Sequence, residues 1–271
     1  MRYQRTALFL GGLACLAVFF GLMWHSHRRS GAELFDRGRT NFKAGAYDDA
    51  ITALNEAIRI DPNNAKAYHY RGWSYERKDD YDRALEDYTA AIRLDPNYSD
   101  AHNSRGVVYY EKGEWDLAIA DYDKAIRLDP KYADAFHNRG LAFRRKRDLD
   151  RAIEDFSTAI ELKPRDFDSW YDRGVTYFRK GDYDSAVYDL SEAVRLNPKS
   201  ALAYEKRGGA YFKRGDLDLA VADLTEAIGL DPHYARAYFA RGAIYRRQGQ
   251  LARSKTDLDK ARELDPSFDA K

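Results

Sequence analysis

The chain has 271 residues, of which 33% are charged and 44% are hydrophobic, and its 45 Lys and Arg side chains nearly balance 44 Asp and Glu side chains. This balance argues against a polybasic nucleic-acid-binding protein and against an acidic disordered tail, because both need a strongly one-sided charge. The single cysteine, Cys15, excludes an intramolecular disulfide and a cysteine metal cluster.

The first thirty residues contain a long apolar segment. Thr6 to Trp24 carries no charge. Arginines flank this segment on both sides: Arg2, Arg5, Arg28 and Arg29. As an α-helix it would be roughly 28 Å long, close to the ~30 Å hydrocarbon core of a bilayer. We therefore predict a single membrane-spanning helix within residues 1–30.

Two questions stay open for this segment: whether it is cleaved as a signal peptide, and on which side of the membrane the repeats lie. A cleaved signal peptide would have a shorter apolar core, and the first small-x-small site, Ser30 to Ala32, lies beyond the paired arginines, so a retained anchor is favoured. Positive charge on both flanks weakens the orientation signal, and Arg2 and Arg5 slightly favour translocated repeats. We expect a single-pass inner-membrane protein with periplasmic rather than cytoplasmic repeats.

Proline marks a regular repeat along the rest of the chain. The prolines lie thirty-four residues apart, at Pro62, Pro96, Pro130, Pro164, Pro198, Pro232 and Pro266. With proline at place 32 of a thirty-four-residue unit, seven units fill residues 31–268: 31–64, 65–98, 99–132, 133–166, 167–200, 201–234 and 235–268. Residues 269–271 form a short tail. Such a fixed period indicates a repeat array.

Each unit contains two blocks of helical periodicity. Glycine at place 8 and alanine at places 20 and 27 let two helices approach closely, and large side chains at places 11 and 24 surround them. Glycine at place 15 in five units suits the end of the first helix, and aspartate at place 18 in six units suits the start of the second. The proline then ends the second helix. Each unit is predicted to be a helical hairpin.

In the fifth unit the recurring residues are Gly174, Tyr177, Ala186, Ala193 and Pro198. This pattern resembles the signature of the tetratricopeptide repeat, and it recurs in all seven units with two exceptions, Asn41 at place 11 of the first and Ser254 at place 20 of the seventh. The resemblance implies an all-α fold: a right-handed α-α superhelical solenoid of seven helical hairpins, here preceded by the membrane helix. It also implies a non-enzymatic adaptor that binds segments of other proteins along a concave groove lined by the first helices.

The chain departs from the family pattern in having charged residues at two recurring places, 7 and 23. Arginine occupies place 7, where the family usually has leucine: Arg37, Arg71, Arg105, Arg139, Arg173, Arg207 and Arg241. Aspartate occupies place 23 in six units: Asp87, Asp121, Asp155, Asp189, Asp223 and Asp257. A buried arginine that loses its counter-charge destabilises a protein by about 3–5 kcal/mol. We therefore expect an Arg-Asp ladder, with pairing either within or between units.

The two terminal units have polar residues where the inner units have apolar ones. Places 21 and 28 are aliphatic in units one to six but are Lys255 and Arg262 in the seventh. In the first unit, Glu33 replaces the small residue of place 3 and Asn41 replaces the aromatic residue of place 11. Solenoids need polar terminal surfaces. We therefore expect an array that is finished at both ends.

The resemblance implies groove residues at places 2, 5, 9, 12 and 13. The candidates in this chain are His69, Trp73, Arg77, Tyr110, His137, Arg144, Arg145, Tyr171, Phe178, Arg179, Phe212, Lys213, Phe239, Arg246 and Arg247. Aromatic residues and arginine dominate interface energetics, so a peptide or protein ligand with acidic and apolar residues would be complementary. A purely structural role is the alternative, because cations at place 13 also interact favourably with the helix dipole.

The sequence contains no recognisable catalytic motif. The six histidines lack metal-ligand spacing and there is no glycine-rich phosphate loop, so we expect no enzyme activity, no metal site and no cofactor. The lysine and asparagine with which some family members clamp a terminal carboxylate are absent from places 5 and 9. A self-associating structural scaffold in a membrane or envelope assembly is the alternative function. Nucleic-acid binding ranks last, because phosphate binding needs a positive excess.

Overall fold

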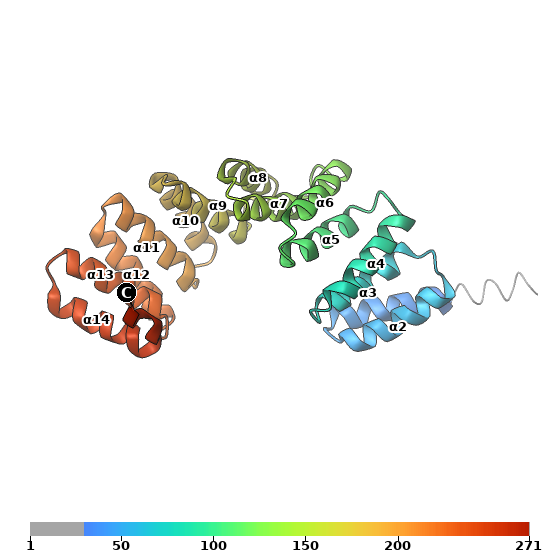
Figure 1. Cartoon of the computed structure of the whole chain (residues 1–271), viewed down its shortest axis with the longest axis horizontal. Helices are drawn as coiled ribbons and strands as arrows, with labels where there is room; N and C mark the ends of the chain where they lie inside the picture. Colours follow the sequence, from blue (N-terminus) through green and yellow to red (C-terminus); the bar gives the residue numbers. More distant parts are fainter. Residues whose placement is uncertain (1–29, 271) are drawn as a thin grey trace, which may run out of the picture. The chain divides into compact units, whose positions relative to one another are not determined.

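A computed structural model describes residues 30–270 of the chain. Regular structure in this part consists of α-helices and one short 3₁₀-helix, without a strand (Figure 1). The first helices of the repeats are residues 30–43, α3 (Ala65–Glu76), α5 (Ser99–Glu111), α7 (Ala133–Arg145), α9 (Phe167–Lys180), α11 (Ala201–Arg214) and α13 (Ala235–Arg247). The second helices are α2 (Tyr47–Ile60), α4 (Tyr81–Leu94), α6 (Trp115–Leu128), α8 (Leu149–Leu162), α10 (Tyr183–Leu196), α12 (Leu217–Leu230) and α14 (Leu251–Leu264), followed by η1 (Pro266–Ala270). The predictions of an all-α fold and of helical hairpins are confirmed.

Helix boundaries follow the thirty-four-residue frame. Every second helix begins at place 17 and ends at place 30, two residues before the proline. Aspartates at place 16 cap several of these helices, since Asp148 and Asp182 accept hydrogen bonds from backbone N–H groups three residues on. Left-handed residues end the first helices, as predicted for glycine at place 15. In the two repeats without that glycine, Asp79 (φ 59°) and Arg147 (φ 65°) adopt the same conformation.

Small residues bring the two helices of each hairpin together. The alanines at places 20 and 27 are buried, and between them lie large buried side chains such as Tyr122 and Phe156. The glycine at place 8 is needed for this contact. A Cβ atom on Gly106 would lie 2.7 Å from the ring of Tyr122. The core of each repeat is thus a large side chain held against a glycine of the facing helix.

The described helices form two compact units that divide between Asp129 and Pro130. The N-terminal unit (residues 30–129) contains the first three repeats, and the C-terminal unit (residues 130–270) contains the last four and η1. Within a unit, each second helix packs against the first helix of its own repeat and against that of the next repeat. First helices also touch each other: α3 touches α5, and α9 touches α7 and α11, while α11 touches α13. One face of each unit is therefore built from first helices, and we call it the first-helix face.

The predicted Arg-Asp ladder is present, and its pairs lie within repeats. Arg71 donates from Nε and Nη2 to the two carboxylate oxygens of Asp87, at 2.8 and 2.6 Å. The third nitrogen of the same guanidinium donates to Asn55 of the preceding repeat at 2.7 Å. A hydroxyl takes this role in later repeats, as where Arg207 donates to Ser191 at 3.2 Å. Five ladder arginines thus close their own hairpin and also join it to the one before: Arg71, Arg105, Arg173, Arg207 and Arg241.

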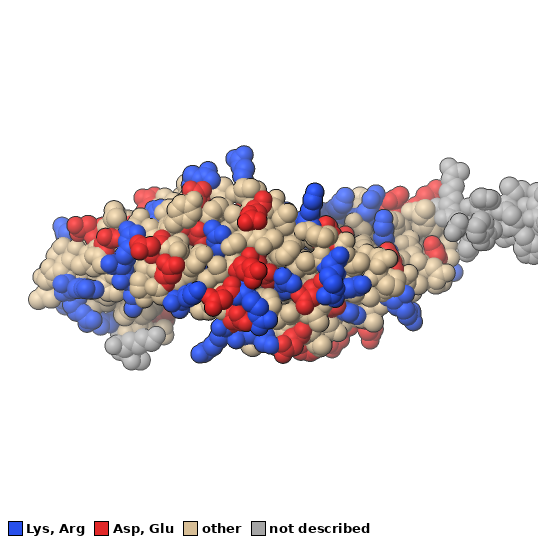
Figure 2. Space-filling view, turned by 90° about the horizontal axis from the view of Figure 1, so that it is seen from above, with Lys and Arg blue, Asp and Glu red and all other residues tan. Residues whose placement is uncertain are grey.

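A second, exposed set of contacts joins neighbouring repeats. Basic side chains at place 14 reach the aspartate at place 18 of the preceding repeat, as in Lys112–Asp82 (2.7 Å) and Lys180–Asp150 (2.6 Å). These aspartates also lie in the first turn of their helices, as predicted. Figure 2 shows basic and acidic side chains interspersed over the face in view. Much of the surface charge is therefore paired locally.

The last second helix, α14, has a polar face where other second helices receive the next repeat. In α12, Val221 and Ile228 pack against a buried cluster that includes residues of α13. At the equivalent places of α14, Lys255 and Arg262 are exposed and both pair with Asp259, at 2.7 and 3.1 Å. This arrangement agrees with the predicted polar ending of the seventh unit.

The predicted membrane anchor, Thr6 to Trp24, lies outside the described residues. Among residues 30–270, none of the helices is long and apolar enough to cross a membrane. The anchor and the right-handed superhelix of the whole array stay predictions.

Candidate protein-interaction face

The first-helix face is built by a fixed pattern of contacts between neighbouring first helices. A side chain at place 5 meets the residue at place 6 of the next repeat, as where His69 contacts Ser104 at 3.0 Å. A side chain at place 12 meets places 6, 9 or 13 of the next repeat. The ring of Phe42, for example, lies 4.5 Å from that of Trp73, centroid to centroid. Places 5, 9, 12 and 13 therefore take part in contacts between neighbouring first helices, and their role in a groove stays a prediction.

In the N-terminal unit this face carries an aromatic cluster. Phe42 contacts Trp73 and Tyr70, and Phe35 packs edge-on against Tyr70 with ring centroids 5.8 Å apart. All four rings are half-buried. Trp73 was assigned to the groove from the sequence, whereas Tyr70, at place 6, was not. The cluster offers a partly exposed aromatic surface of the kind enriched at protein interfaces.

His69 lies beneath this cluster and is buried, so it serves the packing of the face. Its Nδ1 shares a hydrogen bond with the Tyr98 hydroxyl and its Nε2 shares one with the Ser104 hydroxyl, both at 3.0 Å. Burial lowers the pKa of His69 to about 4, although Asp100 opposes the shift. His69 is therefore neutral near pH 7. A neutral, hydrogen-bonded imidazole with both nitrogens occupied is not available to a ligand.

In the C-terminal unit, two predicted groove residues are already paired with an acid that the sequence analysis did not single out. Asp172 accepts from His137 Nε2 at 3.0 Å and from Arg144 Nη1 at 2.7 Å. Burial raises the pKa of Asp172, but the hydrogen bond from His137 and the charge of Arg144 outweigh it, and the pKa lies below its usual value. His137 and Arg144 thus join α7 to α9.

The predicted aromatic groove residues of this unit are half-buried and pack against neighbouring repeats. Phe178 and Tyr171 pack against one buried cluster, and Phe212 packs against another. Phe239 stacks on Phe268 of η1 with ring centroids 4.7 Å apart. In the N-terminal unit, Tyr110 is also half-buried. Part of each of these rings packs against the core, and the rest of the ring is exposed to solvent.

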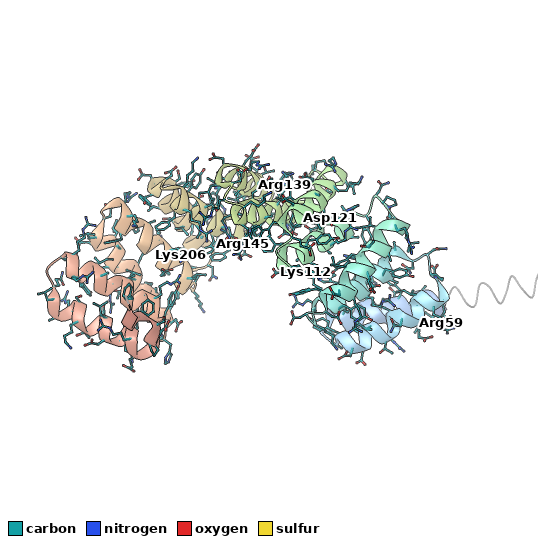
Figure 3. All side chains as sticks on the ribbon, in the orientation of Figure 1. Arg59, Lys112, Asp121, Arg139, Arg145 and Lys206 are labelled. Atoms are coloured by element: carbon teal, nitrogen blue, oxygen red, sulfur yellow. The ribbon has the colours of Figure 1, made fainter. Side chains whose placement is uncertain are left out.

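The exposed cations form the most accessible part of the predicted site. In the C-terminal unit, the last turns of four successive first helices each present one basic residue at place 13, a set that we call the basic edge: Arg145, Arg179, Lys213 and Arg247. Arg246 is exposed beside it, and Arg77 is exposed in the N-terminal unit over the ring of Tyr47. The guanidinium of Arg247 lies 5.5 Å from the centre of the Phe212 ring. Figure 3 labels Arg145 at the end of α7 and Lys206 in α11.

Place 34 contributes to the same face and was missed by the sequence analysis. Its side chain meets place 5 of its own repeat, as in Tyr98–His69 and Tyr234–Glu205. Glu205 is buried and also pairs with Lys206 at 3.0 Å. The recurrence of an aromatic residue at place 34 was a signal in the sequence: Tyr98, Tyr132, Tyr234 and Phe268.

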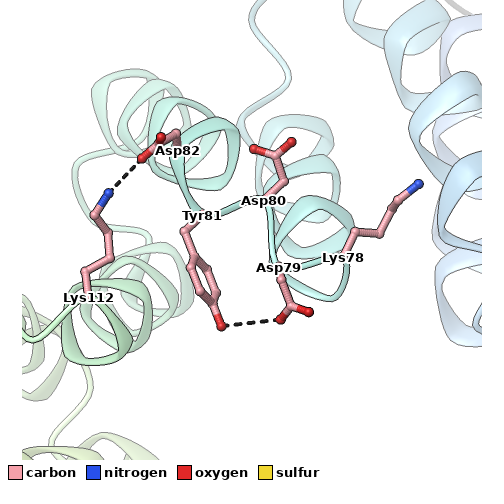
Figure 4. A pocket seen from close by; sticks show the side chains of 6 residues that line it. All are labelled: Lys78, Asp79, Asp80, Tyr81, Asp82 and Lys112. Carbon is pink, nitrogen blue, oxygen red and sulfur yellow. Dashed lines mark hydrogen bonds and ion pairs between the residues drawn. The ribbon is translucent and has the colours of Figure 1, made fainter.

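A polar pocket of about 380 Å³ lies away from these residues, at the turn between α3 and α4 (Figure 4). Its charged groups are engaged. Lys112 pairs with Asp82 at 2.7 Å, and Asp80 caps α4 through Arg83 N at 3.3 Å while pairing with the Arg83 side chain. A hydrogen bond from Arg83 lowers the pKa of Asp80. These carboxylates stabilise the turn and its contact with the next repeat.

Metal ligands do not assemble on the described part of the chain. Between residues 30 and 270, no group of three or more His, Cys, Asp or Glu side chains could hold a metal ion. The arrangement instead offers half-buried aromatic rings and exposed cations. That combination favours non-covalent recognition of another protein.

Similar structures share this fold. The YrrB structure, described as a TPR protein with an unusual peptide-binding site, is 25% identical with a TM-score of 0.59, over 67% of this chain and 94% of YrrB. MamA is 28% identical with a TM-score of 0.55, over 60% of this chain and 95% of its own. A tetratricopeptide repeat protein from Parabacteroides merdae ATCC 43184 is 24% identical with a TM-score of 0.65, over 88% of this chain and 94% of its own.

Family patterns match most of the described repeats. The pattern described as "TPR repeat" matches residues 38–79, 74–113, 108–147 and 208–249, which together exceed half of the chain. Patterns described as "Tetratricopeptide repeat" match residues 137–201 and 235–268. No curated protein matches the sequence. The chain belongs to the tetratricopeptide repeat family.

Proposed function

We propose that the chain is a non-enzymatic adaptor that binds a partner peptide or protein on its first-helix face and is tethered to a membrane through residues 6–24. Tetratricopeptide repeat proteins generally mediate protein–protein interactions, and their fold is typically a non-catalytic scaffold. YrrB, which is similar to this chain, is described as having a peptide-binding site. The apolar segment from Thr6 to Trp24 supports the tether.

The observation that carries this proposal is the basic edge beside half-buried aromatic rings in the C-terminal unit. Arg179 and Lys213 are exposed, and each directly follows a phenylalanine, Phe178 or Phe212, in the sequence. Such a surface complements a segment that has both acidic and apolar residues. The same helix ends also receive dipole stabilisation from these cations, but that effect needs no neighbouring aromatic ring.

Charge reversal tests the proposal. Arg145, Arg179 and Lys213 are each replaced by Glu in the full chain, and partner capture is measured in detergent. Arg144 is left in place, because a carboxylate there would face Asp172 and disturb packing. We expect capture to be lost. The matched control reverses Arg165 and Lys199, which are exposed in loops between repeats. Capture that survives reversal of the basic edge would exclude this site.

Self-association is the second candidate function. Several large apolar side chains are exposed on second helices, among them Tyr188 (63% exposed) and Leu251 (67% exposed). An outer face of this kind favours contacts between copies. Sedimentation of the full chain in detergent tests this reading, and a monomeric mass at all concentrations would exclude it.

Membrane orientation decides which partners are eligible. A labelling tag placed after Lys271 and tested for access from outside the inner membrane reports the compartment of the repeats. We expect access from the periplasmic side. Protection of the tag would place the repeats in the cytoplasm.

A further inference from the structure

Two consecutive glycines in α11 have different reasons for being there. A Cβ atom on Gly208 would lie 3.1 Å from Leu224 Cγ and 3.3 Å from the Ala220 carbonyl oxygen, so close helix packing requires the glycine. A Cβ atom on Gly209 would meet only Phe178 Cε2, at an ordinary 3.8 Å. Glycine within a helix is less favourable than alanine. Packing within the C-terminal unit therefore does not explain Gly209.

The second repeat shows how a large residue at this place contacts the preceding repeat. Gly209 stands at place 9, and the residue that it faces, Phe178, stands at place 12 of the preceding repeat. The equivalent pair in the N-terminal unit is Trp73 and Phe42, whose rings lie 4.5 Å apart at an interplanar angle of 36°. There the indole covers the phenylalanine ring. Gly209 has no side chain to cover Phe178 in this way, and we call the space beside its Cα atom the Gly209 notch.

The charges around the Gly209 notch are positive on one side. Lys213 lies one helical turn beyond Gly209 and is exposed, and Arg179 directly follows Phe178 and is exposed. On the other side, one turn before Gly209, Glu205 is buried and is engaged by Lys206 and Tyr234. A ligand in the notch therefore lies beside exposed cations and beside a buried carboxylate that is paired with Lys206.

We propose that the Gly209 notch receives an aromatic side chain of a partner peptide, which stacks on Phe178 as Trp73 stacks on Phe42, and that acidic residues next to this aromatic pair with Lys213 and Arg179. This inference rests on the proposed adaptor function and names its ligand class: an acidic peptide with an aromatic anchor. Stacked rings and desolvated aromatic anchors supply much of the affinity of such interfaces, and opposite charges at the rim set orientation.

Substitutions at two glycines that lie within helices of this unit and are not required by packing, Gly209 and Gly229, separate binding from folding. Gly209→Val fills the notch with the residue that α9 carries at the same place, Val175, so the fold accommodates it. The control is Gly229→Ala in α12, where a Cβ atom would meet nothing within 4 Å. Gly209→Ala is a second variant, whose methyl group fills less of the notch than the valine side chain does. Each variant is checked by circular dichroism and thermal unfolding, and we expect all three to fold.

The probe is a phage-displayed library of short random peptides, selected on the immobilised full chain in detergent. Selected peptides are then synthesised, and their affinities are measured by fluorescence anisotropy. We expect enrichment of an aromatic residue beside Asp or Glu. Gly209→Val should weaken binding by about tenfold or more, as loss of an aromatic anchor does. Gly229→Ala should bind as the unchanged chain does, and Lys213→Glu should weaken binding of the acidic peptides.

The possible outcomes separate this inference from the adaptor function on which it rests. Selected peptides that bind Gly209→Val as tightly as the unchanged chain would overturn the notch and leave the adaptor function standing. Selected peptides without an aromatic residue would do the same. A library that yields no binding peptide would count against both.

Discussion

Arg173 holds Asp189 through two parallel hydrogen bonds, from Nε to Oδ2 at 2.8 Å and from Nη2 to Oδ1 at 2.9 Å. Only 15% of the arginine side chain and 2% of the aspartate side chain are exposed. Bidentate pairs of this geometry are the strongest of the ionic hydrogen bonds. The pair closes the fifth hairpin at the place where family members usually have leucine.

Removal of one partner of this pair should be costly. Asp189→Ala leaves the guanidinium of Arg173 buried without a counter-charge, and we expect the free energy of unfolding to fall by about 3–5 kcal/mol. Urea unfolding followed by circular dichroism measures it. The matched control is Asp150→Ala, which breaks the exposed pair with Lys180 and should cost about 1 kcal/mol or less. Equal losses would show that the buried pair is worth no more than a surface pair.

Replacement of both partners should restore most of that loss. In Arg173→Met with Asp189→Leu, no buried charge remains, and such apolar replacements are often neutral or stabilising. Ser157 loses the hydrogen bond from Arg173 but keeps its own to the Ile153 carbonyl at 2.6 Å. A double variant as unstable as Asp189→Ala would indicate that the ladder contributes by shape as well as by charge.

Acid should destabilise the N-terminal unit through His69. Burial lowers its folded-state pKa from 6.5 to about 4, so between these pH values the unfolded chain binds more protons than the folded chain. The contribution of His69 to stability is therefore lost as the pH falls from about 6.5 to about 4 and does not change further below that. A drop in the pKa from 6.5 to about 4 corresponds to roughly 3 kcal/mol of stability.

A variant isolates this histidine from the other titrating groups. His69→Asn introduces the residue found at the same place of the next repeat, Asn103, and should flatten the pH dependence between pH 6.5 and 4. Thermal unfolding over that range, with the exposed His233→Asn as control, measures the difference. If both variants retain the slope of the unchanged chain, burial of His69 does not cause it.

An apolar face on α14 should promote association. Lys255→Leu with Arg262→Leu restores the aliphatic residues that Val221 and Ile228 supply in α12, where they pack against the next repeat. We expect a concentration-dependent rise in mass by sedimentation velocity. Arg253→Leu with Glu263→Leu adds equal apolar area on other exposed places of α14 and is the control. An unchanged monomeric size of the first variant would contradict the predicted polar ending of the array.

Much of the local structure could be predicted because it depends on short-range chemistry. Proline at place 32, glycine at places 8 and 15 and alanine at places 20 and 27 placed the helices nearly to the residue. The left-handed turns at Asp79 and Arg147 could not be predicted from composition, since neither residue type requires that conformation. The surrounding hairpin imposes it, because the two helices on either side have the same positions as in the other repeats.

The site was predicted less completely, because periodicity identifies a face but not the partners on it. His137 and Arg144 were assigned to a groove, and both are held by Asp172 across thirty or so residues. Sequence spacing within one repeat gives no information about which side chains meet between repeats. The ladder was the exception, since Arg and Asp recur together and a buried arginine needs a counter-charge.

A ladder arginine such as Arg207 binds both its own repeat and the preceding one through residue types that recur, so whole repeats could be exchanged. Arg207 binds Asp223, which its own repeat supplies, and the hydroxyl of Ser191 in the preceding repeat. The repeat before that one has Ser157 at the same place, where it binds Arg173. Loss of the whole repeat 167–200 would therefore leave Arg207 with Asp223 and with Ser157 to bind, and duplication of it would give the second copy of Arg173 its own aspartate and the hydroxyl of Ser191. At this point of the array, a change in length by thirty-four residues leaves no buried guanidinium without a counter-charge.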